Sequence, residues 1–160
     1  MEQMPILERR RIEAEILAQI YATAENRLGR EEARALLGEA VSNSAIAHGR
    51  GFAAATGRTP DLADFLAILP LWTKNGALEI EILEQSETEL SFNVTRCRYC
   101  EMYTEMGLRE IGDLLSCNRD GDFCVGYNPA IALTRTQTIM GGATHCDFRY
   151  RMPPASDPGE

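Results

Sequence analysis

Residues 117–148 hold most of the side chains in this chain that could do chemistry. The segment contains three of the five cysteines, the acidic pair Asp120 and Asp122, Arg135 within an apparent strand, and a His-Cys-Asp-Phe sequence that starts at His145. Thiols can act as nucleophiles or metal ligands, and a carboxylate can act as a base on water. We therefore expect a catalytic or binding site to be built around this segment.

Two mechanisms follow from the spacing of these residues. A helix over residues 117–124 would place Cys117, Asp120 and Cys124 on one face. The negative charge of Asp120 would raise the pKa of a neighbouring thiol, so Asp120 suits a base on water, or a partner for a cationic substrate group. A thiolate nucleophile at Cys117 would need a nearby positive charge, and Arg135 and His145 are the available sources. The residue pattern leaves both mechanisms open.

Metal sites and familiar catalytic motifs find little support. Cys97 and Cys100 have the spacing of half a zinc site, but no second close pair follows, and the adjacent His145 and Cys146 would point to opposite faces of a strand. The Asp120–Asp122 segment opens like a calcium loop, but no glutamate stands at the closing position. The sequence has no P-loop, Gly-x-Ser-x-Gly elbow or His-Glu-x-x-His motif. We expect no metal and no cofactor.

Composition restricts the partners. The 160 residues are 44% hydrophobic and 25% charged, as in ordinary globular proteins, and the net charge of −8 opposes binding to a phosphate backbone, so we expect no nucleic-acid partner. No apolar run approaches the roughly 20 residues that span a bilayer, and the first residues lack the pattern of a signal peptide. We expect a cytoplasmic protein with no membrane partner, reduced thiols and a small-molecule substrate.

Hydrophobic periodicity predicts three helices in a helical part that covers about residues 5–75. They are expected over about 5–28, 30–56 and 59–69. In the first helix, Ile12, Ile16 and Ile20 fall four residues apart and mark the expected apolar stripe. Gly49 and Gly51 predict a kink or an early end in the second helix. The apolar stripes of the first two helices are wide, which predicts a homodimer built partly from them.

Four other positions in the helical part have a local interpretation. Thr59 and Pro60 read as an N-cap and a first helical residue for the third helix. A lone histidine on a helix, such as His48, more often packs or faces solvent than takes part in catalysis. Trp72, the only tryptophan, is expected to pack in the core, with the wall of a pocket as the alternative.

The apolar period changes to two in a strand-rich part that covers about residues 77–151. Strands are predicted over about 78–82, 90–95, 130–140 and 145–151, and inserted helices over about 98–106 and 108–115. Arg135 has the same strand parity as Ile131 and Leu133, so we expect its side chain to point inward. The order predicts one α+β domain over residues 1–152, with the N-terminal helices packed on one face of a roughly four-stranded antiparallel sheet that carries two inserted helices. Residues 153–160 are predicted to be a disordered tail.

The last third of the chain also resembles a known family. Four stretches are similar to the L-2-amino-thiazoline-4-carboxylic acid hydrolase family. They are the strand ending FNVTRC, the segment YCEMYTEMGLREIGDLLSC, the CNRD step and the closing RTQTIMGGATHCDFRY. In that family, water opens a small cyclic amino-thiazoline carboxylate at its amidine-like carbon and gives N-carbamoyl-L-cysteine. The positions that match the family's pattern are Cys97, Cys117, Asp120, Arg135, Thr138, Gly142, Cys146, Asp147 and Phe148.

The resemblance implies a hydrolase that acts on carbon–nitrogen or carbon–sulfur bonds of a small ring. The catalytic candidates are Cys117, Asp120 and Cys146, and the substrate-binding candidates are Arg135, Cys97, Thr138 and His145. Arg135 suits bidentate pairing with the substrate carboxylate, and Asp120 suits the attacking water or the amidine nitrogen. The alternative is a domain of the same fold that binds or senses a small carboxylate without catalysis.

Overall fold

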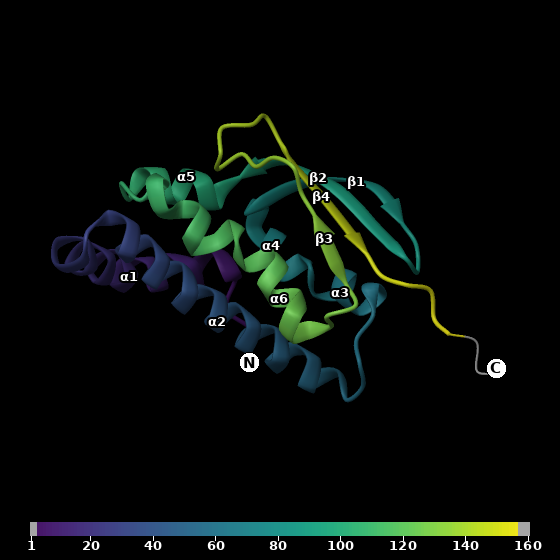
Figure 1. Cartoon of the computed structure of the whole chain (residues 1–160). Coiled ribbons are helices and arrows are strands. Elements are labelled where there is room, and N and C mark those ends of the chain that lie inside the picture. The colour runs from purple at the N-terminus through teal and green to yellow at the C-terminus, as the bar shows by residue number, and fades with distance from the viewer. Residues whose placement is uncertain (1–2, 157–160) are drawn as a thin grey trace.

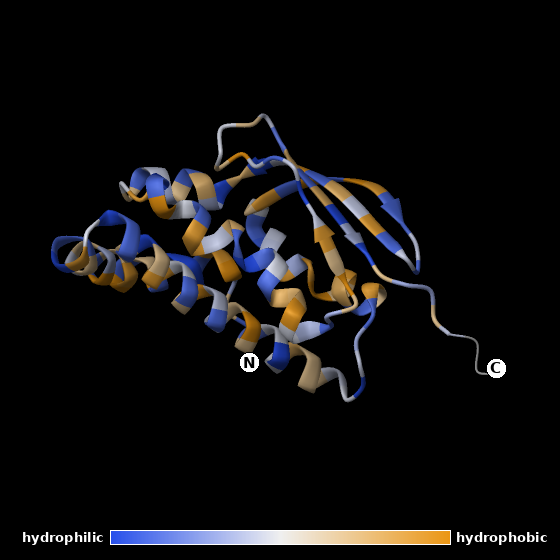
Figure 2. Ribbon diagram, in the orientation of Figure 1, coloured by the Kyte–Doolittle hydropathy of each residue, from blue (hydrophilic) through white to orange (hydrophobic). Residues whose placement is uncertain are grey.

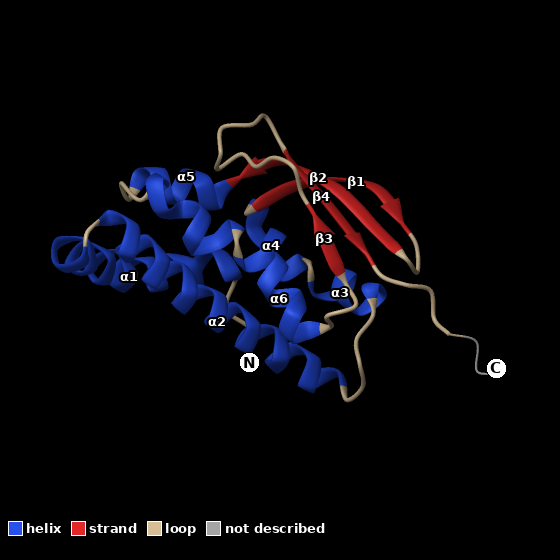
Figure 3. Ribbon diagram, viewed as in Figure 1, coloured by secondary structure: helices blue, strands red, loops and turns tan. Residues whose placement is uncertain are grey.

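The computed structural model describes residues 3–156, in which a helical half precedes an antiparallel sheet (Figures 1 and 3). The helices are α1 (Ile6–Leu28), α2 (Arg30–Thr56), α3 (Leu62–Ile68), α4 (Pro70–Thr73), α5 (Arg98–Glu105) and α6 (Arg119–Tyr127). The strands are β1 (Leu78–Gln85), β2 (Glu89–Cys97), β3 (Ala132–Thr134) and β4 (Cys146–Arg151). Short 3₁₀ turns lie at η1 (Lys74–Gly76) and η2 (Arg109–Ile111), and η3 (Asp113–Cys117) is π-helical.

The sheet has the order β1-β2-β4-β3, and each neighbouring pair of strands is antiparallel. Hydrophobic and hydrophilic residues alternate along the strands (Figure 2), so each strand has one apolar face. Between β2 and β4, Phe92 pairs with Phe148 and Leu90 with Tyr150. The rings of Phe92 and Phe148 stack with their centroids 4.9 Å apart. This apolar face looks toward the helices.

Helices α1, α2 and α6 lie on one side of the sheet, and α6 lies between α2 and the strands (Figure 1). The α+β architecture predicted from the sequence, with N-terminal helices on one face of a four-stranded antiparallel sheet, is therefore confirmed. The first two helices have the predicted extents to within a residue. Within residues 3–156, no helix is both long enough and apolar enough to cross a membrane.

The three isoleucines of the apolar stripe predicted for α1 face outward, whereas Ala24 of the same stripe is buried. Ile12, Ile16 and Ile20 are 46%, 61% and 49% exposed, whereas the buried residues of α1 include Arg10 and Ala14. The side of α1 that packs against the core instead carries Ile6, Ala14, Leu17 and Tyr21, so the three isoleucines turn outward. A stripe of large apolar residues therefore remains uncovered along α1.

We expect this stripe to form the predicted homodimer, which remains a prediction. Leu28 and Leu36 are 57% and 49% exposed and extend the apolar surface from α1 across the turn to α2. A glutamate at Ile16 would place a charge in the centre of such an interface, so Ile16→Glu should convert a dimer to a monomer in sedimentation velocity at micromolar concentration. Val125→Glu, at an exposed apolar residue of α6, is the matched control. A monomeric wild-type protein would end this idea.

Two predictions about the helix ends were wrong. Helix α2 continues through Gly49 and Gly51 to Thr56, with Gly57 as its left-handed C-cap at φ 71°. The N-cap of α3 is Asp61 and not Thr59, because the Asp61 carboxylate accepts hydrogen bonds from two backbone N–H groups of the first turn. The Asp64 carboxylate accepts from the Asp61 N–H in return and completes a capping box.

Other element predictions erred where local hydrogen bonding overrides the apolar pattern. The segment predicted as a helix over about 108–115 is divided between η2 and η3, and β3 covers only Ala132–Thr134 of the strand predicted over 130–140. Residues 153–156 contain no helix or strand, and residues 157–160 of the predicted tail lie outside the described part of the chain.

Candidate active site

Two adjoining cavities lie between the apolar face of the sheet and the helices. One, here the aromatic cavity, is lined mainly by rings, and the other, the thiol cavity, is lined by three cysteines. Their shared wall consists of Arg10, Trp72, Leu78, Arg119, Asp120 and Phe148. The cavities leave about 50 Å³ and 70 Å³ for the centres of water-sized molecules. One water needs only about 10–15 Å³ by the same measure, so a small ring can be held.

An ion pair between Asp120 and Arg135 stands in the thiol cavity. The first turn of α6 carries Asp120, and Arg135 follows the last residue of β3. An Nη atom of Arg135 donates to Oδ2 of Asp120 at 2.7 Å, and the other Nη donates to the carbonyl oxygen of Cys117 at 2.9 Å. The Arg135 side chain is 14% exposed, and its guanidinium carbon lies 5.0 Å from the centroid of the Phe148 ring. Arg135 therefore points inward, as its alternation with Ile131 and Leu133 predicted.

Burial raises the pKa of Asp120, although Arg135 opposes that shift. The side chain of Asp120 keeps 25% of its exposure, and Asp120 lines both cavities. Oδ1 of Asp120 has no hydrogen-bond partner among the residues that the structure describes. A carboxylate with a raised pKa is a stronger base than an ordinary one, and its uncommitted oxygen can accept a proton from water.

The three predicted thiols, those of Cys97, Cys117 and Cys146, all line the thiol cavity. Sγ of Cys97 accepts a hydrogen bond from the N–H of Cys100 at 3.4 Å and caps α5. Sγ of Cys146 accepts from the N–H of Ile139 at 3.2 Å. Two of these thiols therefore hold backbone in place. Cys117 ends η3 and makes no such side-chain contact in the described part of the chain.

Burial raises the pKa of each cavity thiol, and the pKa of Cys97 reaches about 11. At Cys117, the negative charge of Asp120 raises the pKa further, and the opposing effect of Arg135 is smaller. A thiol with this environment is protonated at neutral pH and is a weak nucleophile.

We expect the cavity thiols to react slowly with iodoacetamide. At Cys97, a pKa of about 11 leaves roughly one thiol in 1,000 ionised at pH 8, compared with about one in four for an ordinary thiol of pKa ~8.5, and the pKa values of Cys117 and Cys146 are also raised. Alkylation of the native protein should therefore be about 100-fold slower than alkylation in denaturant, and should speed up as the pH rises toward 11. Peptide mass spectrometry can follow each cysteine. Faster labelling of Cys117 in the native protein than in denaturant would contradict this expectation.

The loop from residue 135 to residue 145 forms one edge of the thiol cavity. The Asp147 carboxylate accepts from the backbone N–H groups of Thr136 and Gln137 at 2.9 Å and 3.0 Å, which takes the donors that a longer β3 would have used. Desolvation raises the pKa of Asp147, but the hydrogen bond from the Thr136 hydroxyl and the two backbone hydrogen bonds together lower that pKa to about 2. Asp147 therefore fixes the loop that brings Thr138 to the cavity wall.

His145 is the predicted site residue that the structure places elsewhere. It lines neither the aromatic nor the thiol cavity. Its ring contacts the side chains of Gln137 and Thr144, and its carbonyl oxygen accepts from Nε2 of Gln137 at 2.9 Å. The other six predicted residues, Cys97, Cys117, Asp120, Arg135, Thr138 and Cys146, converge on the thiol cavity. Their catalytic and binding roles remain predictions.

The shared wall carries a cationic cluster that was not predicted from the sequence. Arg10 of α1 and Arg119 of α6 are 4% and 7% exposed, and both donate to Oε2 of Glu13, at 2.7 Å and 3.2 Å. Nε of Arg119 also donates to the carbonyl oxygen of Leu115 at 2.8 Å. Arg10 lies four residues from the buried Ile6 and four from the buried Ala14. That spacing places Arg10 on the buried face of α1, so the burial of Arg10 could have been predicted from its position relative to Ile6 and Ala14.

His48 lies beside this cluster, at the edge of the aromatic cavity. Burial and the charges of Arg9, Arg10 and Arg119 together lower the pKa of His48 to about 4, against a smaller opposing effect of Glu13. Its ring packs edge-on against Phe123, with centroids 5.7 Å apart. His48 is therefore neutral at pH 7 and is part of the cavity wall, which the sequence did not favour.

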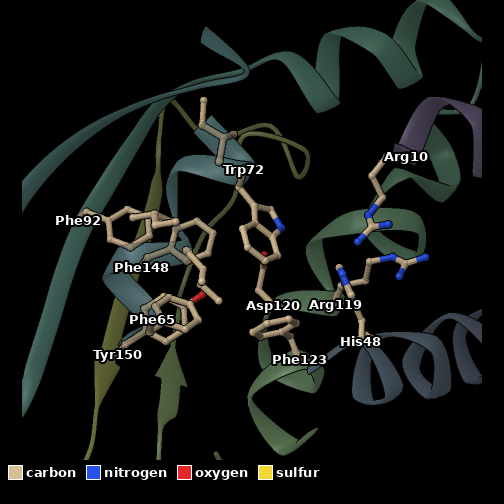
Figure 4. Close-up of a pocket in the computed structure, with 14 residues that line it drawn as sticks. Arg10, His48, Phe65, Trp72, Phe92, Arg119, Asp120, Phe123, Phe148 and Tyr150 are labelled. Atoms are coloured by element: carbon tan, nitrogen blue, oxygen red, sulfur yellow. The ribbon is translucent and has the colours of Figure 1, made fainter. Parts of the chain in front are cut away.

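Figure 4 shows how the groups divide the aromatic cavity. Phe65, Phe92, Phe148 and Tyr150 form one side, Arg10, Arg119 and His48 form the other, and Trp72 and Asp120 stand between them. Across residues 3–156, no group of three or more histidine, cysteine or acidic side chains is placed to hold a metal ion.

Comparisons with solved structures support the fold. The phenol-responsive sensory domain of the transcription activator PoxR, solved with phenol, is 14% identical, covers 87% of this chain and 73% of its own, and has a TM-score of 0.53. A trafficking protein particle complex subunit 3 from Naegleria fowleri, covalently bound to palmitic acid, is 10% identical with a TM-score of 0.50, and the match covers 89% of this chain and 96% of that one. At such identities the likeness concerns the fold alone.

Sequence comparison is more specific. Among curated proteins no sequence matches the chain. The model of the L-2-amino-thiazoline-4-carboxylic acid hydrolase family matches residues 9–150, and this range contains both halves of the fold and all six residues that converge on the thiol cavity. Because the match extends over most of the 160 residues, the chain belongs to the L-2-amino-thiazoline-4-carboxylic acid hydrolase family.

Proposed function

We propose that the protein hydrolyses a small cyclic substrate of the amino-thiazoline carboxylate type, and that Asp120 activates the attacking water. The observation that carries this proposal is the Asp120 carboxylate in the cavity, with one oxygen fixed by Arg135 at 2.7 Å and the other uncommitted. Family membership supports the substrate class. In this proposal Arg135 is a positioning residue, because its guanidinium is already engaged by Asp120 and by the carbonyl oxygen of Cys117.

The proposed reaction balances without a cofactor. Water adds through its oxygen to the ring carbon between sulfur and nitrogen, and Asp120 takes one proton from that water. The carbon–sulfur bond then breaks, and the sulfur leaves with the proton that Asp120 returns. The second proton of the water passes from the new hydroxyl group to the ring nitrogen as the C=O bond forms, so the former amidine becomes a carbamoyl group and an amino-thiazoline carboxylate would give N-carbamoyl-cysteine. The raised pKa values of the cavity thiols favour this route over attack by a thiolate.

The test is incubation with L-2-amino-thiazoline-4-carboxylate in ¹⁸O-labelled water, followed by mass spectrometry. Product with one ¹⁸O in the carbamoyl group is expected, and no mass shift of the protein should accumulate. A ligand that binds without any product after many hours would overturn the proposed activity. A protein adduct on Cys117 would replace water attack with a cysteine nucleophile.

A binding or sensing domain without catalysis is the second candidate. It is favoured by the aromatic cavity, and by the fold shared with the phenol-responsive sensory domain. The same incubation separates the two candidates, because a sensor binds the ring compound and leaves it intact.

A further inference from the structure

We propose that Arg10 and Arg119 form an anion-binding site, and that this site holds the carboxylate of a ligand whose flat ring lies against the aromatic side of the cavity. The site is formed by two helices that are far apart in the sequence, α1 and α6, and it lies on the wall shared by both cavities. The inference concerns binding, and it goes beyond the proposed function because it holds whether or not the bound ring is then hydrolysed.

The two guanidinium groups have too little negative charge around them. Both are more than nine-tenths buried, and both use the same oxygen of Glu13. The other oxygen of Glu13 accepts from Nε of Arg9 at 2.8 Å. A buried charge that lacks a partner is strongly unfavourable, because burial removes its hydration. One carboxylate thus serves two buried cations and one exposed cation, and the buried pair retains a net positive charge.

Both groups also have hydrogen-bond donors to spare. Among residues 3–156, Arg10 makes one hydrogen bond, to Glu13, and Arg119 makes two, to Glu13 and to the carbonyl oxygen of Leu115. A guanidinium carries more N–H donors than these contacts use. Each unpaired nitrogen of the two residues keeps some accessible surface, and both residues line the two cavities, so a ligand there is within reach of the spare donors. The charge of Asp120 on the same wall also acts on Arg10 and Arg119, but the ion pair of Asp120 with Arg135 offsets that charge.

The surroundings of His48 agree with an excess of positive charge. Burial and the three neighbouring arginines keep its pKa near 4, so His48 adds no further cation at neutral pH. Burial and the charge of Arg10 lower the pKa of Arg119 itself to about 10. An anion bound between Arg10 and Arg119 would relieve this repulsion.

The cavity selects the class of anion. The planar guanidinium matches the planar carboxylate, and a single excess positive charge suits a monoanion. Across the cavity, Phe65, Phe92 and Phe148 offer ring faces and edges to an apolar body (Figure 4). A small planar ring with one carboxylate satisfies both sides, and it would bring its ring close to Asp120 on the shared wall.

The experiment compares benzoate with benzamide, which has nearly the same shape and no charge. Trp72 is the only tryptophan and lines both cavities, so its fluorescence reports binding. Benzoate is expected to bind at least tenfold more tightly than benzamide. Arg10→Met and Arg119→Met should each weaken benzoate at least tenfold and leave benzamide unchanged. Arg34→Met is the matched control, because Arg34 also binds an acid and a carbonyl oxygen but lines neither cavity.

Three results would overturn the site. They are equal affinity for benzoate and benzamide, no detectable binding of either, and loss of benzoate binding in Arg135→Met with retention in both Arg10→Met and Arg119→Met. The comparison of the two ligands on the wild-type protein needs no variant, so it decides the matter even if a variant fails to fold. Benzoate has no bond that the proposed reaction would break, so failure of hydrolysis and failure of the anion site are observed separately.

Discussion

Asp120→Asn is expected to lower kcat for an amino-thiazoline carboxylate by about 10²–10⁴-fold, the usual contribution of a general base. The amide keeps the shape of the side chain and an oxygen for the hydrogen bond from Arg135, but it cannot take a proton from water. Binding of the substrate should change much less than turnover. Cys117→Ser should retain most of the rate, because burial and Asp120 already keep the Cys117 thiol protonated.

Single-turnover kinetics on both variants is the measurement. Asp122→Asn is the matched control, since Asp122 lies in the same first turn of α6 but lines neither cavity. Full activity of Asp120→Asn would show that the proposed base is wrong. Loss of activity in Cys117→Ser, with activity retained in Asp120→Asn, would establish the nucleophilic mechanism that the sequence left open.

The residue pattern predicted the architecture because, in the long helices and strands, the apolar repeat continues regularly over many residues. Helices α1 and α2 and the β1–β2 hairpin follow from it directly. The burial of α1 did not follow, because periodicity identifies an apolar stripe without saying what covers it. Ala14 and Arg10 face inward, and Ile16 at 61% exposure faces outward.

The loop after β3 could not be read from periodicity. Apolar and polar residues alternate beyond Thr134, but the donors of that segment are taken by side chains that come later in the chain. The Asp147 carboxylate binds the N–H groups of Thr136 and Gln137, and Sγ of Cys146 accepts from the N–H of Ile139. Such contacts depend on the folded register of β4, which no local pattern contains.

The thiol cavity was predicted better than the anion site. Family-pattern residues from β2, η3, α6 and β4 converge there, as the resemblance suggested. Arg10 was missed because it stands in a run of three arginines with glutamates nearby, which is typical of a solvated face. Arg119 was missed because the segment was read for its thiols and carboxylates. The spacing of four residues between Ile6 and Arg10, which puts both side chains on one face of α1, was the only feature that indicated the burial of Arg10.

The close packing of α2 against α6 positions Asp120, and it depends on Gly49, one of the two glycines that predicted a weakness in α2, and on Gly126 of α6. A Cβ atom on Gly49 would overlap the carbonyl oxygen of Phe123 and lie 2.8 Å from the backbone nitrogen of Tyr127. A Cβ atom on Gly126 would overlap the carbonyl oxygen of Ile46. These neighbours are backbone atoms of helices, so neither can rotate away. The two helices would have to separate.

Gly49→Ala and Gly126→Ala are therefore each expected to lower the free energy of unfolding by about 3 kcal/mol or more, at the upper end of overpacking effects. For a domain of this size, that corresponds to a fall of roughly 6–12 °C in Tm. Gly51→Ala is the matched control, because Gly51 lies in the same helix with no atom within 4 Å of its added Cβ. It should stabilise the protein by up to ~1 kcal/mol through helix propensity. Urea denaturation of the three variants measures these differences. Equal stability of Gly49→Ala and Gly51→Ala would mean that α2 and α6 do not approach as closely as this structure shows, and that the position of Asp120 relative to Arg10 and Arg119 needs revision.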